Sequence, residues 1–337
     1  MKLGLIWGYW GQLPPPNLIE ATREAEQLGY DSVWTSEAWG SDAFSPLAYL
    51  AGHTERIKLG TAVVQLAART PTATAMHVLT LDHLSGGRAI LGLGVSGPQV
   101  VEGWYGQPSN RPLARTREYV EIIRRALARE EPVEFDGEFF QHPYHGPGSV
   151  GLGKPLKPIT HPLRREVPIY LGAEGPKNVA QTAEIADGWL PLYYSPHHQG
   201  VYADQLAGAS DDFEIAAMVQ MNINDDLDAA LLPVKMMVGF YIGGMGAKGQ
   251  NYHTKLMERF GYVDEALHIQ QLFMDGKREE AVAAVPDEFA DAISLCGPID
   301  RIRERLDAWR ASPVTTLLVT AGGDQGLLRT AAELVLD

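Results

Sequence analysis

The amino-acid sequence predicts a closed (β/α)8 barrel with two insertions. Strand-like runs alternate with amphipathic helical runs from the first residue, eight such units can be counted, and most connections between them are short. Repeated β/α units form a parallel sheet, and eight of them close into a barrel whose active site lies at the carboxyl ends of the strands. Barrels of this kind often form one domain, so a single domain over residues 1–337 is expected.

The first four units show the clearest patterns. The helix expected at 18–28 ends before Gly29, and the helix at 71–84 begins with Pro71 and stops before Gly86 and Gly87. The run at 57–64 is rich in β-branched residues, as strands are. The four expected strands cover residues 2–7, 31–35, 57–64 and 88–94.

The remaining units are separated by insertions after the fourth helix and between the seventh and eighth strands. Residues 130–165 contain a Gly/Pro-rich run and are expected to be a lid or a disordered insert, whereas residues 225–313 have a helical composition. Within the latter, 234–242 is assigned to helix because it continues a helical run. The other expected elements are strands 167–171, 188–193, 213–223 and 315–320, helices 113–129 and 178–186, and a final helix from Gln325.

Composition restricts the classes of ligand. With 28 Lys and Arg against 42 Asp and Glu, the formal net charge of −14 argues against nucleic acids and anionic membranes as partners. The single cysteine, Cys296, excludes an intrachain disulfide, and no His/Cys spacing predicts a metal site. The N-terminal apolar run is too short for a signal peptide or a membrane span. A cytoplasmic protein that binds small molecules is therefore expected.

Gly92, Gly94 and Gly97 form a G-x-G-x-x-G pattern directly after a predicted strand. In a dinucleotide-binding Rossmann fold, a helix opens at the last glycine and holds the pyrophosphate. Here Pro98 follows at once, and the next expected helix begins only near Leu113. A Rossmann site is therefore not predicted, and the glycines need another explanation.

Aromatic, small and polar residues follow the predicted strands. Such a lining is expected for a large planar cofactor. The run GAEGPKN leads from a strand into a helix, which favours an anion, and Lys177 could add a charge or be a solvated surface lysine. Tyr9, Trp10 and Trp39 could instead cap the barrel core. Glu37 is either functional or a solvated carboxylate at a strand end.

The stretches LGTAVVQLAARTPTATAMHVLTLDHLSGGRAILGLGVSGP and IYLGAEGPKNVAQTAEIADGWLP resemble the luciferase-like monooxygenase superfamily, specifically its branch of oxidoreductases dependent on coenzyme F420, a deazaflavin. The likeness extends from Met1 to about Pro313 and into the eighth strand. In this family a bulge in strand three, often with a non-prolyl cis peptide, backs the cofactor ring. The matching positions are Ala62 and Val63.

The resemblance implies roles for individual residues. Glu37 is implied as the catalytic residue, while the position after it, often a histidine in these relatives, is Ala38. A basic cluster, Lys154, Lys157, Arg164 and Arg165, could close over an anionic cofactor tail or be a solvated loop. The substrate contacts expected are Tyr9, Trp10 and Trp39. The cofactor contacts expected are Ala62, Val63, Gln65, Gly94, Ser96, Gly97, Ala173, Glu174, Gly175, Lys177, Tyr194 and Ser195.

These implications predict an F420-dependent enzyme that transfers a hydride between the deazaflavin ring and a small organic substrate. Two alternatives remain open: a monooxygenase that uses flavin mononucleotide (FMN) and oxygen, and a non-catalytic flavin- or deazaflavin-binding protein. Apolar helices at 46–54 and 71–84 could form the face of a homodimer or pack on their own barrel.

Overall fold

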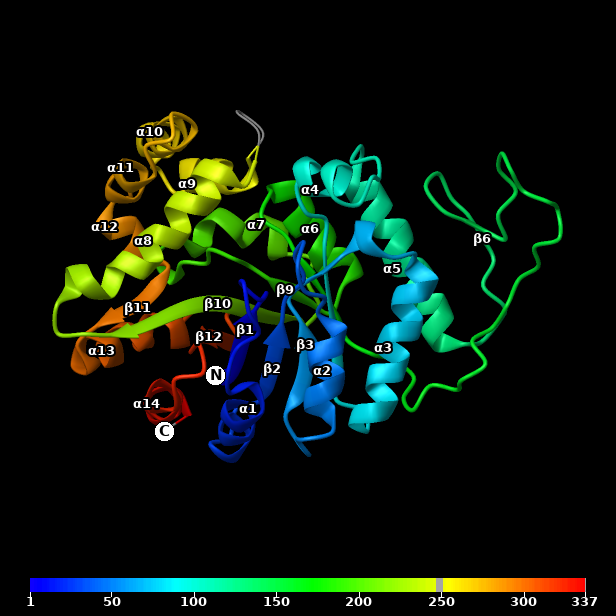
Figure 1. The fold of residues 1–337 in the computed structure, drawn as a ribbon, viewed down its shortest axis with the longest axis horizontal. Helices are drawn as coiled ribbons and strands as arrows, with labels where there is room; N and C mark the ends of the chain where they lie inside the picture. Colours follow the sequence, from blue (N-terminus) through cyan, green and yellow to red (C-terminus); the bar gives the residue numbers. More distant parts are fainter. Residues whose placement is uncertain (247–250, 337) are drawn as a thin grey trace.

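The computed structural model describes residues 1–246 and 251–336, in which a parallel sheet closes on itself and is surrounded by helices (Figure 1). The hydrogen-bonded order runs β10-β12-β1-β2-β3-β5-β8-β9 and returns to β10. The expected (β/α)8 barrel is confirmed. Its strands are β1 (Lys2–Gly8), β2 (Ser32–Thr35), β3 (Lys58–Thr61), β5 (Ala89–Gly94), β8 (Ile169–Gly172), β9 (Gly188–Leu190), β10 (Glu214–Ile223) and β12 (Thr316–Thr320).

Two separate apolar clusters stabilise the barrel. The larger one lies between the strands and the surrounding helices, and a smaller one fills the barrel interior around Ile6, Trp34, Tyr170 and Leu318. Successive strand residues point to opposite faces, so Trp189 enters the outer cluster and its neighbour Leu190 the inner one. The interior is therefore closed by side chains below the mouth.

The strand expected at 57–64 is interrupted by a bulge. The Ala62–Val63 peptide bond is cis, as the resemblance implied, and pairing with β5 resumes at β4 (Val64–Gln65). A Cβ atom on Gly92 would lie 1.8 Å from the Thr61 carbonyl oxygen, and one on Gly94 would lie 2.4 Å from Val63 Cγ2. Gly92 and Gly94 therefore allow β5 to pack closely against β3 and the bulge. The sequence analysis, which expected Gly94 as a cofactor contact, did not predict this role.

Helices cover the outside of the barrel, and most expected helices are confirmed within a few residues. The exception is α4, which begins at Pro98 directly after Gly97, where the sequence analysis expected none. A glycine pattern followed by a helix thus occurs in this barrel without a Rossmann sheet. The helices are α1 (Leu18–Gln27), α2 (Phe44–Ala51), α3 (Pro71–Ser85), α4 (Pro98–Gly103), α5 (Pro112–Ala128), α6 (Pro176–Ile185), α7 (Ala203–Leu206), α13 (Ile299–Arg310) and α14 (Gln325–Leu336), with short 3-10 turns η1 (Leu66–Ala68) and η2 (Pro196–Tyr202).

The insertion at 225–313 is mainly helical, as expected, and residues 247–250 within it lie outside the described part. Helix 234–242 is confirmed as part of α8 (Leu227–Gly244). An unexpected strand, β11 (Ser294–Gly297), extends the sheet beside β10. The other elements are α9 (Tyr252–Arg259), α10 (Val263–Met274), α11 (Arg278–Ala283) and α12 (Asp287–Ala292). Among the described helices, α8 alone is long and apolar enough to span a membrane, and it packs against α10, α11 and α12.

The insertion at 130–165 projects from the side of the barrel beyond α5 and contains one antiparallel pair, β6 (Phe135–Asp136) and β7 (Gln141–His142) (Figure 1). Arg164 binds Asp82 at 2.7 Å and also the carbonyl of Ala89, the first residue of β5. Lys157 donates to the Glu130 carbonyl. Because Ala89 marks the amino end of its strand, Arg164 is anchored away from the mouth. For Arg164 and Lys157, the alternative in which the basic cluster closes over a cofactor tail is therefore wrong.

Candidate active site

A cavity of 960 Å³ opens at the carboxyl ends of the strands. Its wall is formed by the bulge after β3, by the residues that follow β5, β8 and β9, and by α5, α8 and α9 of the surrounding layer. Leu190, Leu192 and Met218 supply its apolar floor. The site is therefore a large, mainly apolar pocket with polar groups on one side, as pockets for planar ligands are.

Nine of the residues expected to contact a cofactor line this cavity together. They come from three separate segments that the barrel brings to one edge. They are Ala62, Val63, Gly94, Ser96, Gly97, Ala173, Glu174, Gly175 and Lys177.

Gly175 and Lys177 lie where α6 begins. Gly175 is the residue before the helix, and a Cβ atom built on it would meet nothing within 4 Å. Lys177, in the first turn, faces the same cavity. The unpaired N–H groups of a helix start and its dipole favour an anion. This end of the cavity therefore suits a phosphate, and the open space beside Gly175 leaves room for one.

Tyr194 and Ser195 do not line the cavity, so their expected role as cofactor contacts is wrong. Strand β9 ends at Leu190, three residues earlier than expected, and of residues 191–195 only Leu192 lines the cavity. Tyr194 is fully buried against Trp189, and burial raises the pKa of its hydroxyl to about 12. Ser195 accepts the N–H of His197 at the start of η2.

The aromatic residues expected to bind substrate lie outside the cavity wall. Tyr9 and Trp39 are 44% and 48% exposed, and the backbone N–H of Trp10 donates to Ser41 Oγ. Tyr9 nevertheless hydrogen-bonds Tyr241, which lines the cavity and whose pKa is raised by burial. Tyr9 therefore reaches the site indirectly, and the structure brings neither Trp10 nor Trp39 into it.

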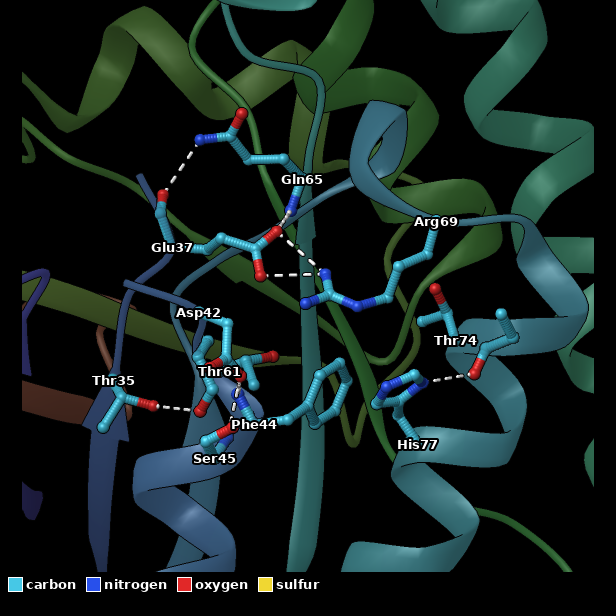
Figure 2. Close-up of polar contacts among 12 residues, drawn as sticks. Thr35, Glu37, Asp42, Phe44, Ser45, Thr61, Gln65, Arg69, Thr74 and His77 are labelled. Carbon is cyan, nitrogen blue, oxygen red and sulfur yellow. Dashed lines mark hydrogen bonds and ion pairs between the residues drawn. The ribbon is translucent and has the colours of Figure 1, made fainter. Parts of the chain in front are cut away.

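Glu37 lies behind the bulge, in an ion pair with Arg69 (Figure 2). Arg69 Nη1 is 2.9 Å from Oε1 and 2.8 Å from Oε2 of the carboxylate. Gln65 donates its N–H to Glu37 Oε1 and its side-chain amide to the Glu37 carbonyl, at 3.2 and 2.9 Å. Neither Glu37 nor Gln65 lines the large cavity. The geometry favours a positioning role for both residues. It does not support the expected role of Glu37 as the catalytic residue or that of Gln65 as a cofactor contact.

The end of β2 also binds the carbonyl groups of Ala62 and Val63. The Glu37 N–H donates to the Val63 carbonyl at 3.2 Å, and Ser36 Oγ donates to the Ala62 carbonyl at 2.6 Å. Buried carbonyl groups need such partners. The end of β2 therefore fixes the position of Val63, whose side chain forms part of the cavity wall.

Several lining residues were missed by the sequence analysis. Tyr241, Met245, Tyr252 and His253 come from the helical insertion, and Arg111 precedes α5. His253 Nδ1 lies 2.8 Å from Glu174 Oε1, with both side chains largely buried. These two residues are distant in sequence, so only the packing of α9 over the loop after β8 reveals the pair.

The fold and the site together define the class: a (β/α)8 barrel with a ligand cavity at its mouth, beside a bulge that contains a non-prolyl cis peptide. Comparison with known families agrees, because the family described as luciferase-like monooxygenase matches residues 7–316. The chain belongs to this family.

Similar proteins place the chain within the family. It is 52% identical, over 98% of both chains, to "Putative coenzyme F420-dependent oxidoreductase Rv3520c" of Mycobacterium tuberculosis. It is 33% identical to 5,10-methylenetetrahydromethanopterin reductase of Archaeoglobus fulgidus, over 90% of this chain and 88% of the relative. The assignment to the branch that contains F420-dependent oxidoreductases is confirmed.

A solved structure supports the fold. The coenzyme F420-dependent tetrahydromethanopterin reductase of Methanopyrus kandleri superposes with a TM-score of 0.80 at 23% identity, over 99% of this chain and 98% of that one. Nearly the whole chain therefore follows the architecture of that enzyme, insertions included.

Proposed function

We propose that the protein is an F420-dependent oxidoreductase that transfers a hydride between the deazaflavin ring and a small organic substrate. The observation that carries this proposal is the 960 Å³ cavity, whose wall brings together nine of the residues expected to contact the cofactor. Ala62 and Val63, at the bulge after β3, form part of that wall. The 52% identical relative is named as a putative coenzyme F420-dependent oxidoreductase, which supports the choice of cofactor.

The residues present fit the cofactor. Val63 and Ala62 would support the ring, and Gly94, Ser96 and Gly97 would follow its side chain. The space beside Gly175 and the charge of Lys177 would accept the phosphate. When bound, coenzyme F420 supplies a ring carbon that accepts or donates a hydride.

The chain's own groups would then orient the substrate and handle a proton. Leu190, Leu192 and Met218 exclude water from the floor of the cavity. His253 lines the cavity, and its Nδ1 is held 2.8 Å from Glu174 Oε1, which leaves Nε2 as the atom that can give or take a proton. His253 would thus supply a proton donor or acceptor to the cavity in a protein that has alanine at position 38.

Fluorescence titration with oxidised F420, and separately with FMN, tests the proposal. The substitution Gly175→Leu would fill the open space at the start of α6 without backbone strain, because φ at this residue is −70°. Affinity for F420 should fall about tenfold or more, as expected for loss of a charge-assisted contact. The control is Gly208→Leu, whose Cβ also meets nothing within 4 Å but which lies outside the cavity.

Binding of F420 in preference to FMN, with loss in Gly175→Leu only, is the expected result. Preference for FMN would favour the oxygen-using monooxygenase. Binding of neither, or equal loss in both variants, would overturn the assignment of the site. A non-catalytic binding protein would bind F420 and yet reduce or oxidise no member of a panel of alcohols, ketones and imines.

A further inference from the structure

A second, smaller cavity of 260 Å³ lies beside the large one. Val95, Ser96, Pro112 and Tyr252 line both cavities, so the two share a wall at the end of β5 and the start of α5. The function proposed above uses only the large cavity. A ligand held there can extend into the smaller one past the shared residues.

Two guanidinium groups, those of Arg69 and Arg115, lie on the wall of the small cavity. Arg69 is neutralised by its ion pair with Glu37. Within residues 1–246 and 251–336, Arg115 has no carboxylate within ion-pair distance, and its buried Nε has no hydrogen-bond partner. Of these two guanidinium groups, that of Arg115 therefore has no bonded carboxylate in the described part of the chain.

The acidic residue nearest Arg115 does not bond to it. Glu118 attracts Arg115 electrostatically, but its carboxylate accepts the backbone N–H groups of Glu138, Phe139 and Phe140, at 2.8 to 3.1 Å. Burial lowers the pKa of the Arg115 guanidinium, because removal of water penalises the charged form. The Arg115 side chain is partly buried and its Nε has no partner, so a carboxylate from a ligand would supply the counterion that the described part of the chain does not.

The rest of the cavity restricts the ligand's shape. The Arg115 guanidinium packs over the ring of Phe139, with 4.7 Å between the Arg115 Cζ atom and the ring centroid. Phe140, Leu66 and Val101 add apolar wall, and the volume is about a quarter of that of the large cavity. The space therefore suits a carboxylate on a short apolar stem, and a planar guanidinium can bind both of its oxygens.

We propose that the small cavity is a carboxylate-binding subsite, with Arg115 as its anchor, for an acidic group of a ligand whose ring or reacting end occupies the large cavity. That the ligand spans both cavities rests on the proposed function; the binding of a carboxylate by Arg115 does not. The acidic group could belong to the glutamate tail of the cofactor or to an acidic substrate. Both sources present the same chemistry to Arg115.

The test compares Arg115→Gln with Arg117→Gln. Arg117 lies two residues further along the same helix but pairs with Glu184 at the surface, outside both cavities. The first probe is glutarate, with uncharged glutaramide beside it, titrated calorimetrically into the protein without cofactor. The second is fluorescence titration with F420 and with its tail-free deazaflavin chromophore. Arg115→Lys keeps the positive charge, so binding retained by this variant and lost by Arg115→Gln would show that the charge is what matters. Thermal unfolding of every variant shows whether any of them misfolds.

We expect glutarate but not glutaramide to bind, and Arg115→Gln to weaken that binding about tenfold or more while Arg117→Gln does not. A parallel loss of affinity for F420, with the tail-free chromophore unaffected, identifies the cofactor tail as the source. Unchanged F420 affinity identifies a substrate carboxylate. If glutarate binds equally to both variants, or not at all, the proposal is overturned. If no deazaflavin binds, the proposed function fails, and the glutarate result still decides the subsite.

Discussion

Glu37 and Arg69 form an ion pair directly behind the cis Ala62–Val63 bulge, with side chains that are 3% and 17% exposed. The Glu37 N–H also holds the Val63 carbonyl, so the pair connects the end of β2 to the cavity wall. Arg69 in turn lines the small cavity. One interaction therefore links the support of the ring-binding wall to the proposed carboxylate subsite.

Removal of one partner of this pair should destabilise the protein more than removal of both. Glu37→Gln leaves the Arg69 charge unpaired, for which we expect a loss of about 3–5 kcal/mol in the free energy of unfolding. The double variant Glu37→Gln/Arg69→Met should recover part of that loss. Urea denaturation measures both. Asp31→Asn is the control, because its partner Lys58 is 45% exposed and the pair should be worth under about 1 kcal/mol. A double variant no more stable than the single one would contradict the expectation.

The packing of β5 against the bulge leads to a second prediction. Gly94→Ala places a Cβ atom 2.4 Å from Val63 Cγ2, so we expect a loss of about 1–3 kcal/mol and weaker cofactor binding. Val63→Ala removes that methyl group and should restore stability in the double variant. Gly92→Ala should be worse and beyond such rescue, because its Cβ would meet the Thr61 carbonyl at 1.8 Å. Thermal unfolding of the parent, Gly94→Ala, Gly94→Ala/Val63→Ala and Gly92→Ala measures their order of stability. Equal stability of Gly94→Ala and the parent would refute the prediction.

The sequence predicted the barrel well because the signals for strands and helices lie within short stretches of neighbouring residues. Hydrophobic periodicity and helix-stop glycines such as Gly86 located the strands and helices to within a few residues, and β11 was the main strand missed. Prediction of the residues that line the site required more than hydrophobic periodicity. Tyr194 was misplaced because strand β9 ends early, and a shift of that size changes which side chains face the mouth.

Pairings between distant segments were beyond the reach of the sequence pattern. No spacing rule connects Glu174 with His253, or Glu37 with Arg69, because these contacts depend on how α9 and the segment after β4 pack in three dimensions. The glycines show the same limit. Their pattern was visible, but the atoms that require Gly92, at the Thr61 carbonyl, lie on a neighbouring strand.

Lys177 provides a third prediction, which rests on the proposed cofactor. Lys177→Gln removes a positive charge from the end of the cavity where α6 begins, so affinity for F420 should fall about tenfold. The dependence of that affinity on salt concentration should also become weaker, because one fewer charge attracts the anionic tail. Fluorescence titrations between low and moderate salt measure both effects. Lys277→Gln is the control, since Lys277 pairs with Glu280 on the surface of the insertion. Equal effects of the two substitutions would exclude a contact between Lys177 and the cofactor.

His198 gives a prediction about pH. Its ring stacks on Phe260 with centroids 4.8 Å apart, and its Nδ1 lies 3.0 Å from Ser195 Oγ. Burial, and then the neighbouring His197, lower the pKa of His198 from its usual 6.5. Between that lowered value and 6.5, the unfolded chain binds more protons than the folded one, so stability must fall as the pH falls through this window.

The variant His198→Gln lacks this titration. Its free energy of unfolding should decline less steeply than that of the parent below pH 6.5, and the difference between the two proteins should be constant above about pH 8, where the imidazole is neutral in both states. His142, whose pKa is also lowered by burial, accounts for part of the slope that remains. Urea denaturation at a series of pH values between about 5 and 8 measures the slopes. Parallel curves for parent and variant over the whole range would show that protonation of His198 is not linked to unfolding.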